Sequence, residues 1–403
     1  MIKKNILLII FLILPLLAIF YFPVIFSFYL FLMMLILLNK YNNNMLYLLG
    51  FFFAFGLATI SAGLDSVKGD FNLYYSYYNY ITIPDDKYFR FVFLSTLKYF
   101  HLSPRLYSFL CIFLIYFLFV IYSIKWADCF KRSVRDRYSV FILFLLTISI
   151  IPISLLTSYE NALAFVFLFV ALYYNSIGNR IVSLLILALS ISVHMSVVVF
   201  IPFILFRWHK KNNNTLFLYS FLVVIVLCLI SFGMVSLLPS SVAQLYDRFI
   251  YYTTGPWAKY VNLYEFYFLV CNFILVIIYS RLYFIYKKTA NVYVLKIFIF
   301  MLPLLFFFLC FRTLSLRYIT VGMLIYSPLM LFYLLDKAKS IYKRVMIIFL
   351  ILFFSIPFNM NMKNIYSSYW RNPNADSNII SILSSQPIIV INNIDVNDRL
   401  LKL

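Results

Sequence analysis

The chain has 403 residues, of which 65% are hydrophobic and only 11% are charged, and its mean hydropathy is +0.97. This composition excludes an ordinary soluble domain, and the long apolar runs lack the alternating pattern of a membrane β-barrel. The net charge of +20 does not indicate nucleic-acid binding, because basic flanks are what orients membrane helices. We therefore predict an all-α polytopic membrane protein that binds membrane lipid and no nucleic acid.

Apolar runs of spanning length predict about 11 to 13 transmembrane helices, since one crossing needs about 20 apolar residues. The expected crossings cover residues 6–20, 24–38, 45–63, 104–124, 138–156, 161–178, 215–238, 264–284, 293–311, 318–335 and 345–358. They form one expected transmembrane domain over residues 1–358. The polar tail, residues 359–403, is expected to be periplasmic.

Charge in the loops predicts which ends of these helices share a side of the membrane. Residues 125–137 and 336–344 are rich in lysine and arginine, so the positive-inside rule makes both loops cytoplasmic. Counting crossings from that side places four segments on the outer face: residues 64–103, 157–160, 239–263 and 312–317.

Residues 181–206 are too long for one upright crossing, because a single helix of that length would rise about 39 Å. One tilted crossing would also put the basic residues 207–211 outside. We expect instead a broken or re-entrant helical hairpin that turns near His194. Irregular backbone at membrane depth is tolerated where it lines a cavity, so the break indicates one.

The first outer loop combines tyrosines with charges, which suits sugar binding by ring stacking and hydrogen bonding. Its candidates for substrate binding are Tyr74, Asp86 and Arg90, and Asp70 of the same loop is a candidate for catalysis. The alternative is an interfacial tyrosine belt with an Asp86 to Arg90 ion pair on one helix.

Two further ionisable residues are expected at or below the membrane surface, where such groups are costly and often functional. Glu160 opens the helix expected at residues 161–178, and its alternative role is to complement the dipole of that helix. His194 lies among apolar residues, and its alternative role is that of a hydrogen-bonded core residue.

Arginines on the outer face are unexpected under the positive-inside rule, and a guanidinium fork binds phosphate oxygens in pairs. Arg248, Arg312 and Arg317 are therefore candidates for binding a diphosphate, the alternative being contact with lipid headgroups. The sequence has no nucleotide-binding glycine loop and no paired acidic motif, and we expect neither a metal nor a cofactor.

Several short elements together resemble the O-antigen and exopolysaccharide polymerases of the Wzy and EpsG-like type. The elements are Gly69-Asp70 with Tyr74, Asp85-Asp86, Asn161-Ala162-Leu163-Ala164, His194-Met195-Ser196 leading to Pro202, and Arg317-Tyr318. The resemblance extends over nearly the whole chain. In one place it fails, because many relatives have an arginine just before the Ala-rich helix where this chain has Tyr159-Glu160-Asn161.

The resemblance implies a glycosyltransferase of the bacterial inner membrane with a GT-C-like fold. It would join undecaprenyl-diphosphate-linked oligosaccharide repeat units at the periplasmic face, with a chain-length regulator protein as a candidate partner. Arg248, Arg312 and Arg317 would then stabilise the diphosphate leaving group, and one of Asp70, Glu160 or His194 would be the catalytic base. The alternatives are an O-antigen ligase, a lipid-linked oligosaccharide flippase or other transporter, a membrane-bound O-acyltransferase, and a structural membrane subunit.

Overall fold

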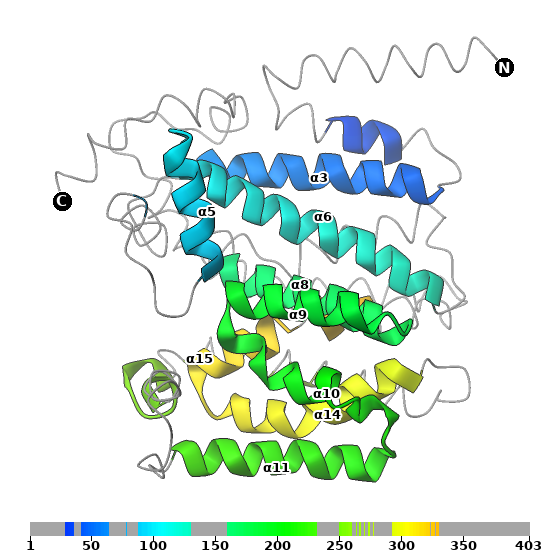
Figure 1. Cartoon of the computed structure of the whole chain (residues 1–403), viewed down its shortest axis with the longest axis vertical. Coiled ribbons are helices and arrows are strands. Elements are labelled where there is room, and N and C mark those ends of the chain that lie inside the picture. The colour runs from blue at the N-terminus through cyan, green and yellow to red at the C-terminus, as the bar shows by residue number, and fades with distance from the viewer. Residues whose placement is uncertain are drawn as a thin grey trace.

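The computed structural model describes residues 29–35, 42–63, 78, 88–129, 159–231, 250–259, 263, 266, 270, 273–274, 277, 292–322, 324–326 and 328–329. Within these residues all regular structure is helical and there is no β-strand (Figure 1), which confirms the all-α prediction. The crossings expected at residues 6–20, 138–156 and 345–358 lie outside the described residues. So does the tail, residues 359–403.

Six longer helices lie lengthwise beside one another and build the body of the protein (Figure 1). They are α3 (Asn43–Gly63), α6 (Arg105–Cys129), α8 (Tyr159–Ser176), α9 (Arg180–Val193), α11 (Asn213–Ser231) and α14 (Val292–Leu309). Helix α6 packs between α3 and α8, α8 packs on α9, and α14 packs on α11. Apart from α9, these helices lie where the apolar runs predicted crossings.

Helix α6 is long and apolar enough to cross a membrane over residues Arg105–Asp128, and among the described residues it is the one helix that is. Shorter apolar helices cover Asn43–Thr59, Arg180–Val193, Met195–Leu205, Asn213–Cys228 and Tyr293–Leu309. A long core helix of a soluble protein has the same length and composition. The multiple membrane crossings therefore stay a prediction.

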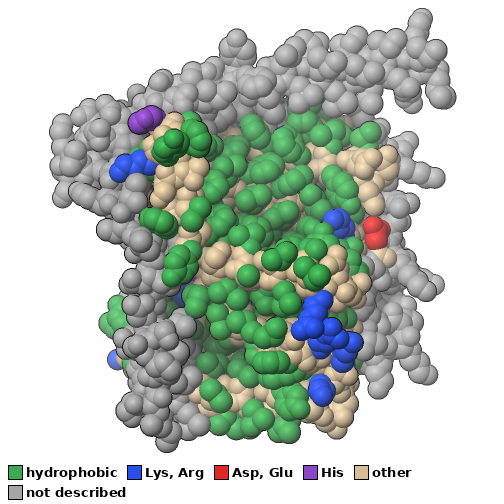
Figure 2. Space-filling model, in the orientation of Figure 1, with side chains coloured by type: hydrophobic (Ala, Val, Ile, Leu, Met, Phe, Trp, Pro, Cys, Tyr) green, Lys and Arg blue, Asp and Glu red, His purple; other side chains and the backbone are tan. Residues whose placement is uncertain are grey.

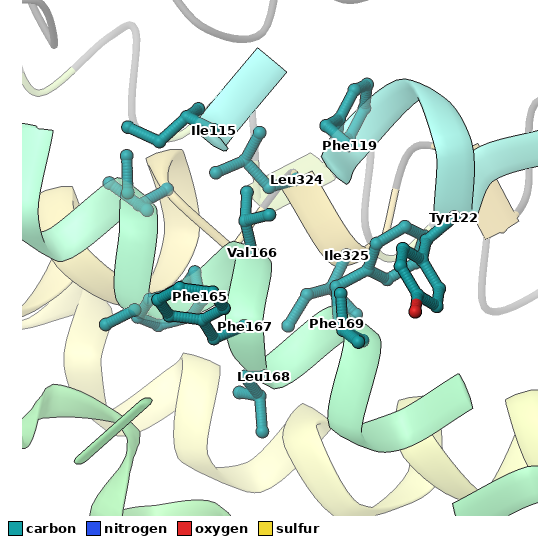
Figure 3. Close-up of a cluster of buried hydrophobic side chains, with 14 of the residues drawn as sticks. Ile115, Phe119, Tyr122, Phe165, Val166, Phe167, Leu168, Phe169, Leu324 and Ile325 are labelled. Carbon is teal, nitrogen blue, oxygen red and sulfur yellow. The ribbon is translucent and has the colours of Figure 1, made fainter. Parts of the chain in front are cut away.

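Helix α8 lies at the centre of the fold, with every residue from 159 to 172 buried. A helix that is apolar on all sides has to be surrounded by protein or lipid. Figure 3 shows its consecutive side chains from Phe165 to Phe169 pointing to different sides, toward Ile115 and Phe119 of α6 and toward Leu324 and Ile325. The position of α8 allows its first turn to contact several elements at once.

Serines bring α9 close to α8. The Ser183 hydroxyl donates to the Ala171 carbonyl at 2.8 Å, and the Ser190 hydroxyl donates to the Ala164 carbonyl at 2.6 Å. Small residues permit close approach of helix backbones, and here their hydroxyls also hydrogen-bond across the contact. The two helices are thus joined along their length by buried polar contacts.

Residues 180–205 form a hairpin that breaks at His194, as the sequence predicted. Helix α9 ends at Val193, His194 is extended with φ of −158°, and the chain continues as η2 (Met195–Phe200) and α10 (Ile201–Leu205). The Arg180 guanidinium donates to the Leu205 carbonyl at 3.3 Å, so both limbs end at the same level. The return limb is a 3-10 helix followed by a single α-helical turn, and not the second regular helix that we expected.

One helix was considered only as an alternative to a loop. Helix α5 (Tyr88–Tyr99) lies inside the segment 64–103 that we expected to be a loop, and it crosses the ends of the longer helices (Figure 1). Its 12 residues are too few to cross a bilayer, so the search for spanning runs passed over it. Two short elements, α15 (Arg312–Ser315) and η5 (Leu316–Thr320), follow α14 at the same end of the body.

The body has two ends with different groups of chain segments. At the first, which we call the basic end, the start of α3 meets the end of α6, where the Asn43 amide donates to Asp128 at 3.3 Å. The starts of α11 and α14 meet there too, where Lys296 donates to the Asn213 side chain at 2.6 Å. The opposite end, which we call the site end, holds α5, the starts of α6 and α8, the end of α9 and α15 (Figure 1). His194 follows α9 and η5 follows α15, so both lie at this end as well. This grouping is the one that the loop charges predicted.

Candidate functional site

The first turn of α8 is the centre of a buried polar cluster at the site end. Tyr159, Glu160 and Asn161 follow one another there, and all three are buried. Successive residues of a helix point about 100° apart, so each of the three contacts a different neighbour. We call these residues and their hydrogen-bond partners the polar hub.

Glu160 forms a buried ion pair with Arg90 of α5. Nε and Nη2 of Arg90 donate to the two carboxylate oxygens, and both side chains are almost fully buried, with 2% and 3% of their surface exposed. The Tyr107 hydroxyl of α6 adds a third hydrogen bond to Glu160 Oε1, at 2.9 Å. A paired guanidinium and carboxylate compensate each other's charge, whereas either one alone would be costly to bury.

Sequence reasoning did not foresee this partner of Arg90. It suggested Asp86, four residues earlier, and Asp86 lies outside the described residues. The ion pair ties α5, which comes from the expected outer loop, to the central helix. A guanidinium therefore lies beside the start of α8 although the sequence has no arginine just before that helix.

Tyr159 makes a second link to α6. Its hydroxyl is 2.9 Å from that of Ser108, and its ring lies 5.8 Å from the ring of Tyr107 in an edge-to-face arrangement. The hydrogen bonds of Tyr107 and Tyr159 fix the start of α8 against α6, and the ion pair fixes it against α5.

Asn161 links the central helix to the break in the hairpin. The Ser196 hydroxyl donates to Asn161 Oδ1 at 2.6 Å, and the Ser196 backbone N–H donates to His194 Nδ1 at 3.1 Å. A backbone N–H can only donate, so Nδ1 is an acceptor and the ring proton belongs on Nε2. His194 thus caps η2 through Nδ1, the role that Ser or Asn usually fills at a helix start.

Element η5, a short π-helix, supplies two more residues. The Tyr318 hydroxyl donates to the Ser196 carbonyl, and its ring stacks on that of Phe308 with 3.9 Å between centroids. Arg317 donates from Nη2 to the Tyr252 hydroxyl at 2.9 Å, and its guanidinium carbon lies 4.3 Å from the centre of the Tyr252 ring. π-helical turns are rare and are often found at functional sites.

The arginines of the site end therefore differ in how their charge is compensated. Arg90 is buried against a carboxylate, whereas the contact of Arg317 with Tyr252 is to a neutral phenol and leaves its positive charge in place. Arg312 and Arg317 are both half-buried. A half-buried guanidinium whose face rests on an aromatic ring is suited to binding an anion along its edge.

The structure brings together some of the predicted site residues. Arg90 and Glu160 contact each other, His194 connects to the same turn of α8 through Ser196 and Asn161, and Arg317 is next to Tyr318 in η5. Other candidates lie outside the described residues, namely Asp70, Tyr74, Asp86 and Arg248. Their roles stay predictions.

Sequence reasoning assigned no role to the phenols and hydroxyls that connect the charged residues. Ser196 and Tyr318 appeared only as members of short elements, and Tyr107 and Tyr252 did not appear at all. Position gave a signal for two of them, since Ser196 comes two residues after His194 and Tyr318 directly follows Arg317. Tyr107 and Tyr252 could not be found without knowing which helices are neighbours.

Across the described residues, no group of three or more His, Cys, Asp or Glu side chains is placed to hold a metal ion. Comparison of the chain with models of known protein families, with curated proteins and with solved structures finds no match. The resemblance to polysaccharide polymerases accordingly stays a prediction that depends on the chain's own residues.

Proposed function

We propose that this chain is a membrane glycosyltransferase, an O-antigen or exopolysaccharide polymerase that joins undecaprenyl-diphosphate-linked repeat units. In this proposal it crosses the bacterial inner membrane several times in a GT-C-like arrangement, and its active site faces the periplasm. The main support is the position of Arg317, a half-buried cation held by a phenol at the opposite end of the body from the exposed Arg207, Lys210 and Lys211.

The grouping of chain segments supports the proposed sidedness. Exposed cations at one end agree with a cytoplasmic face, since lysine and arginine are enriched there. The opposite end then faces the periplasm, and it holds both Arg312 and Arg317. Lipid-linked repeat units that have been moved across the membrane would meet the protein on that side.

The reaction requires stabilisation of a leaving diphosphate. A hydroxyl oxygen of the acceptor sugar attacks the anomeric carbon of the donor glycan, and the bond from that carbon to the diphosphate oxygen breaks. The electron pair leaves with undecaprenyl diphosphate, and the hydroxyl proton passes to a base. Arg317 and Arg312 are proposed to bind the diphosphate, where they stabilise the charge that develops on it.

The hydrogen bonds of the polar hub bear on the choice of base. Both carboxylate oxygens of Glu160 are bound by Arg90, and Nδ1 of His194 is occupied by Ser196. We therefore assign Glu160 and His194 to positioning the start of α8 and the hairpin break. Asp70 is the remaining candidate for the base, from outside the described residues.

Replacement of Arg317 by Ala tests the proposal in the bacterium that carries the chain. The matched control is Lys259→Ala, which removes an exposed cation that lies, like Arg317, at the site end. We expect single repeat units without long-chain glycan for Arg317→Ala, normal glycan ladders for the control, and equal amounts of both proteins in the membrane fraction. Normal ladders from Arg317→Ala refute the assignment, and polymer that is made but not attached to the lipid A core indicates a ligase instead.

A further inference from the structure

Four exposed cations gather where the two limbs of the hairpin meet at the basic end. They are Arg180, Arg207, Lys210 and Lys211, which we call the anchor patch. Arg180 reaches the Leu205 carbonyl, and backbone N–H groups of Lys210 and Lys211 close the following turn at 2.9 Å. Figure 2 shows lysine and arginine side chains gathered at this end of the molecule.

The charge of the anchor patch is not compensated by acidic residues of the described part of the chain. No carboxylate there forms an ion pair with any of the four, and Asp128 hydrogen-bonds to Asn43 instead. Lys296 adds a further positive charge beneath the patch, because its ammonium group donates to the Lys211 carbonyl. Like charges held this close together favour an external anion.

Large apolar side chains border the same patch. Ile181 has 75% of its surface exposed and Phe206 has 61%, and both are next to an arginine of the patch in sequence. Exposed apolar residues beside cations are typical of the boundary between headgroups and acyl chains, where the apolar part enters the lipid and the charge stays with phosphate.

Arg207 has a backbone conformation that is costly for its side chain. Its φ is 53°, in the left-handed region where glycine or asparagine would be less strained. The turn thus keeps a cation at a position where geometry favours a smaller residue. The turn presents the Arg207 guanidinium in the same exposed patch as Lys210 and Lys211.

We propose that the anchor patch binds the phosphate groups of anionic phospholipids, with Ile181 and Phe206 in the adjacent acyl layer. The inference rests on the membrane placement in the proposed function and adds to it a lipid-binding site at the end opposite the polar hub. A phospholipid matches both features of the patch, since its phosphate pairs with the cations and its acyl chains contact Ile181 and Phe206. A free anion would account for the cations alone.

Lipid binding can be measured on the purified full chain reconstituted in nanodiscs of phosphatidylcholine, with phosphatidylglycerol added at increasing fractions. Native mass spectrometry then counts the phosphatidylglycerol molecules retained. Each basic residue near an anionic surface contributes about a fivefold factor, so the variant with Arg207→Gln, Lys210→Gln and Lys211→Gln should bind about a hundredfold more weakly. The single variant Lys210→Gln is compared with Lys259→Gln, which removes one exposed charge at the other end. Only Lys210→Gln should weaken the binding of phosphatidylglycerol.

Equal retention of both lipids by the wild-type chain overturns the inference, and so does an equal loss in Lys210→Gln and Lys259→Gln. Full competition by inorganic phosphate also overturns it, since the site would then take a free anion. A chain that does not enter nanodiscs overturns the membrane placement as well. If Arg317→Ala abolishes glycan polymerisation but retains phosphatidylglycerol as the wild type does, the catalytic site and the lipid site are separate. Each proposal can then fail without the other.

Discussion

The two ends of the protein use positive charge in opposite ways. At the basic end, Arg180, Arg207, Lys210 and Lys211 are exposed and have no carboxylate partner among the described residues. At the site end, Arg90 is buried against a carboxylate, and Arg317 is half-buried against a phenol.

The cations that make up the net charge of +20 therefore contribute to folding in different ways. An exposed cation is solvated and contributes little to folding, whereas a buried one must be compensated by the fold itself. Removing the buried Arg90 should therefore damage the fold, whereas removing an exposed cation such as Arg180 should leave it intact.

The largest effect is expected for Arg90→Met, which leaves the Glu160 carboxylate buried without the guanidinium. Breaking a buried pair in this way costs about 3 to 5 kcal/mol, whereas Arg180→Gln should change the free energy of unfolding by less than about 0.5 kcal/mol. Thermal unfolding in detergent measures both. The double variant Arg90→Met with Glu160→Met should recover most of the loss, because no charge is then buried. Equal stability of the two single variants would show that the ends do not differ.

A smaller effect is expected at the hairpin break. His194→Ala removes the side chain that accepts the Ser196 N–H, and loss of such a cap costs about 1 kcal/mol. His194→Asn should keep the cap, since Asn is a favoured cap residue, while it removes the imidazole. Stability and glycan ladders together distinguish the roles. Wild-type ladders from His194→Asn would support positioning by capping, and their loss at wild-type stability would show that the imidazole takes part in the chemistry.

The smallest effect is a pH dependence at the basic end. Burial lowers the pKa of His209, nearby Lys210, Arg207 and Lys296 lower it further, and a hydrogen bond with the backbone of Phe203 acts against them. Because the unfolded chain then binds the proton more readily, the stabilisation from His209 is fully present above about pH 6.5 and declines as the pH falls. The contribution of His209 is the unfolding midpoint of the wild type minus that of His209→Gln, measured from pH 7.5 to 5.5. A difference that stays constant over this range would contradict the prediction.

Periodicity and charge were sufficient to predict much of the fold. The runs that became α3, α6, α8, α11 and α14 are long and apolar, and the excess length of residues 181–206 revealed the break at His194. Helix α5 was not among the expected crossings because its 12 residues are too few to cross a membrane. The residues Pro84-Asp85-Asp86 before it can nevertheless start a helix.

The candidate site was less predictable than the fold. Glu160 was noticed because an ionisable group at the membrane surface is costly, and Arg317 because the positive-inside rule disfavours arginine on the outer face. Their partners were not, because Arg90 and Glu160 are 70 residues apart, and only the packing of α5 on the body brings them together. A tyrosine such as Tyr107 is one among 35 in the sequence, and nothing local distinguishes it.

The closed base of the 180–205 hairpin has a consequence for biogenesis. Helix α9 has 14 residues and rises about 21 Å, less than the thickness of the hydrocarbon layer, and Arg180 lies against Leu205 where the chain comes back. In the proposed membrane placement, the tip of this hairpin would lie within the membrane, so the translocation machinery would not have to move a loop of it through to the periplasm. The hairpin would enter the membrane from the side after α8 is in place, because the serines of α9 hydrogen-bond to backbone carbonyls of α8.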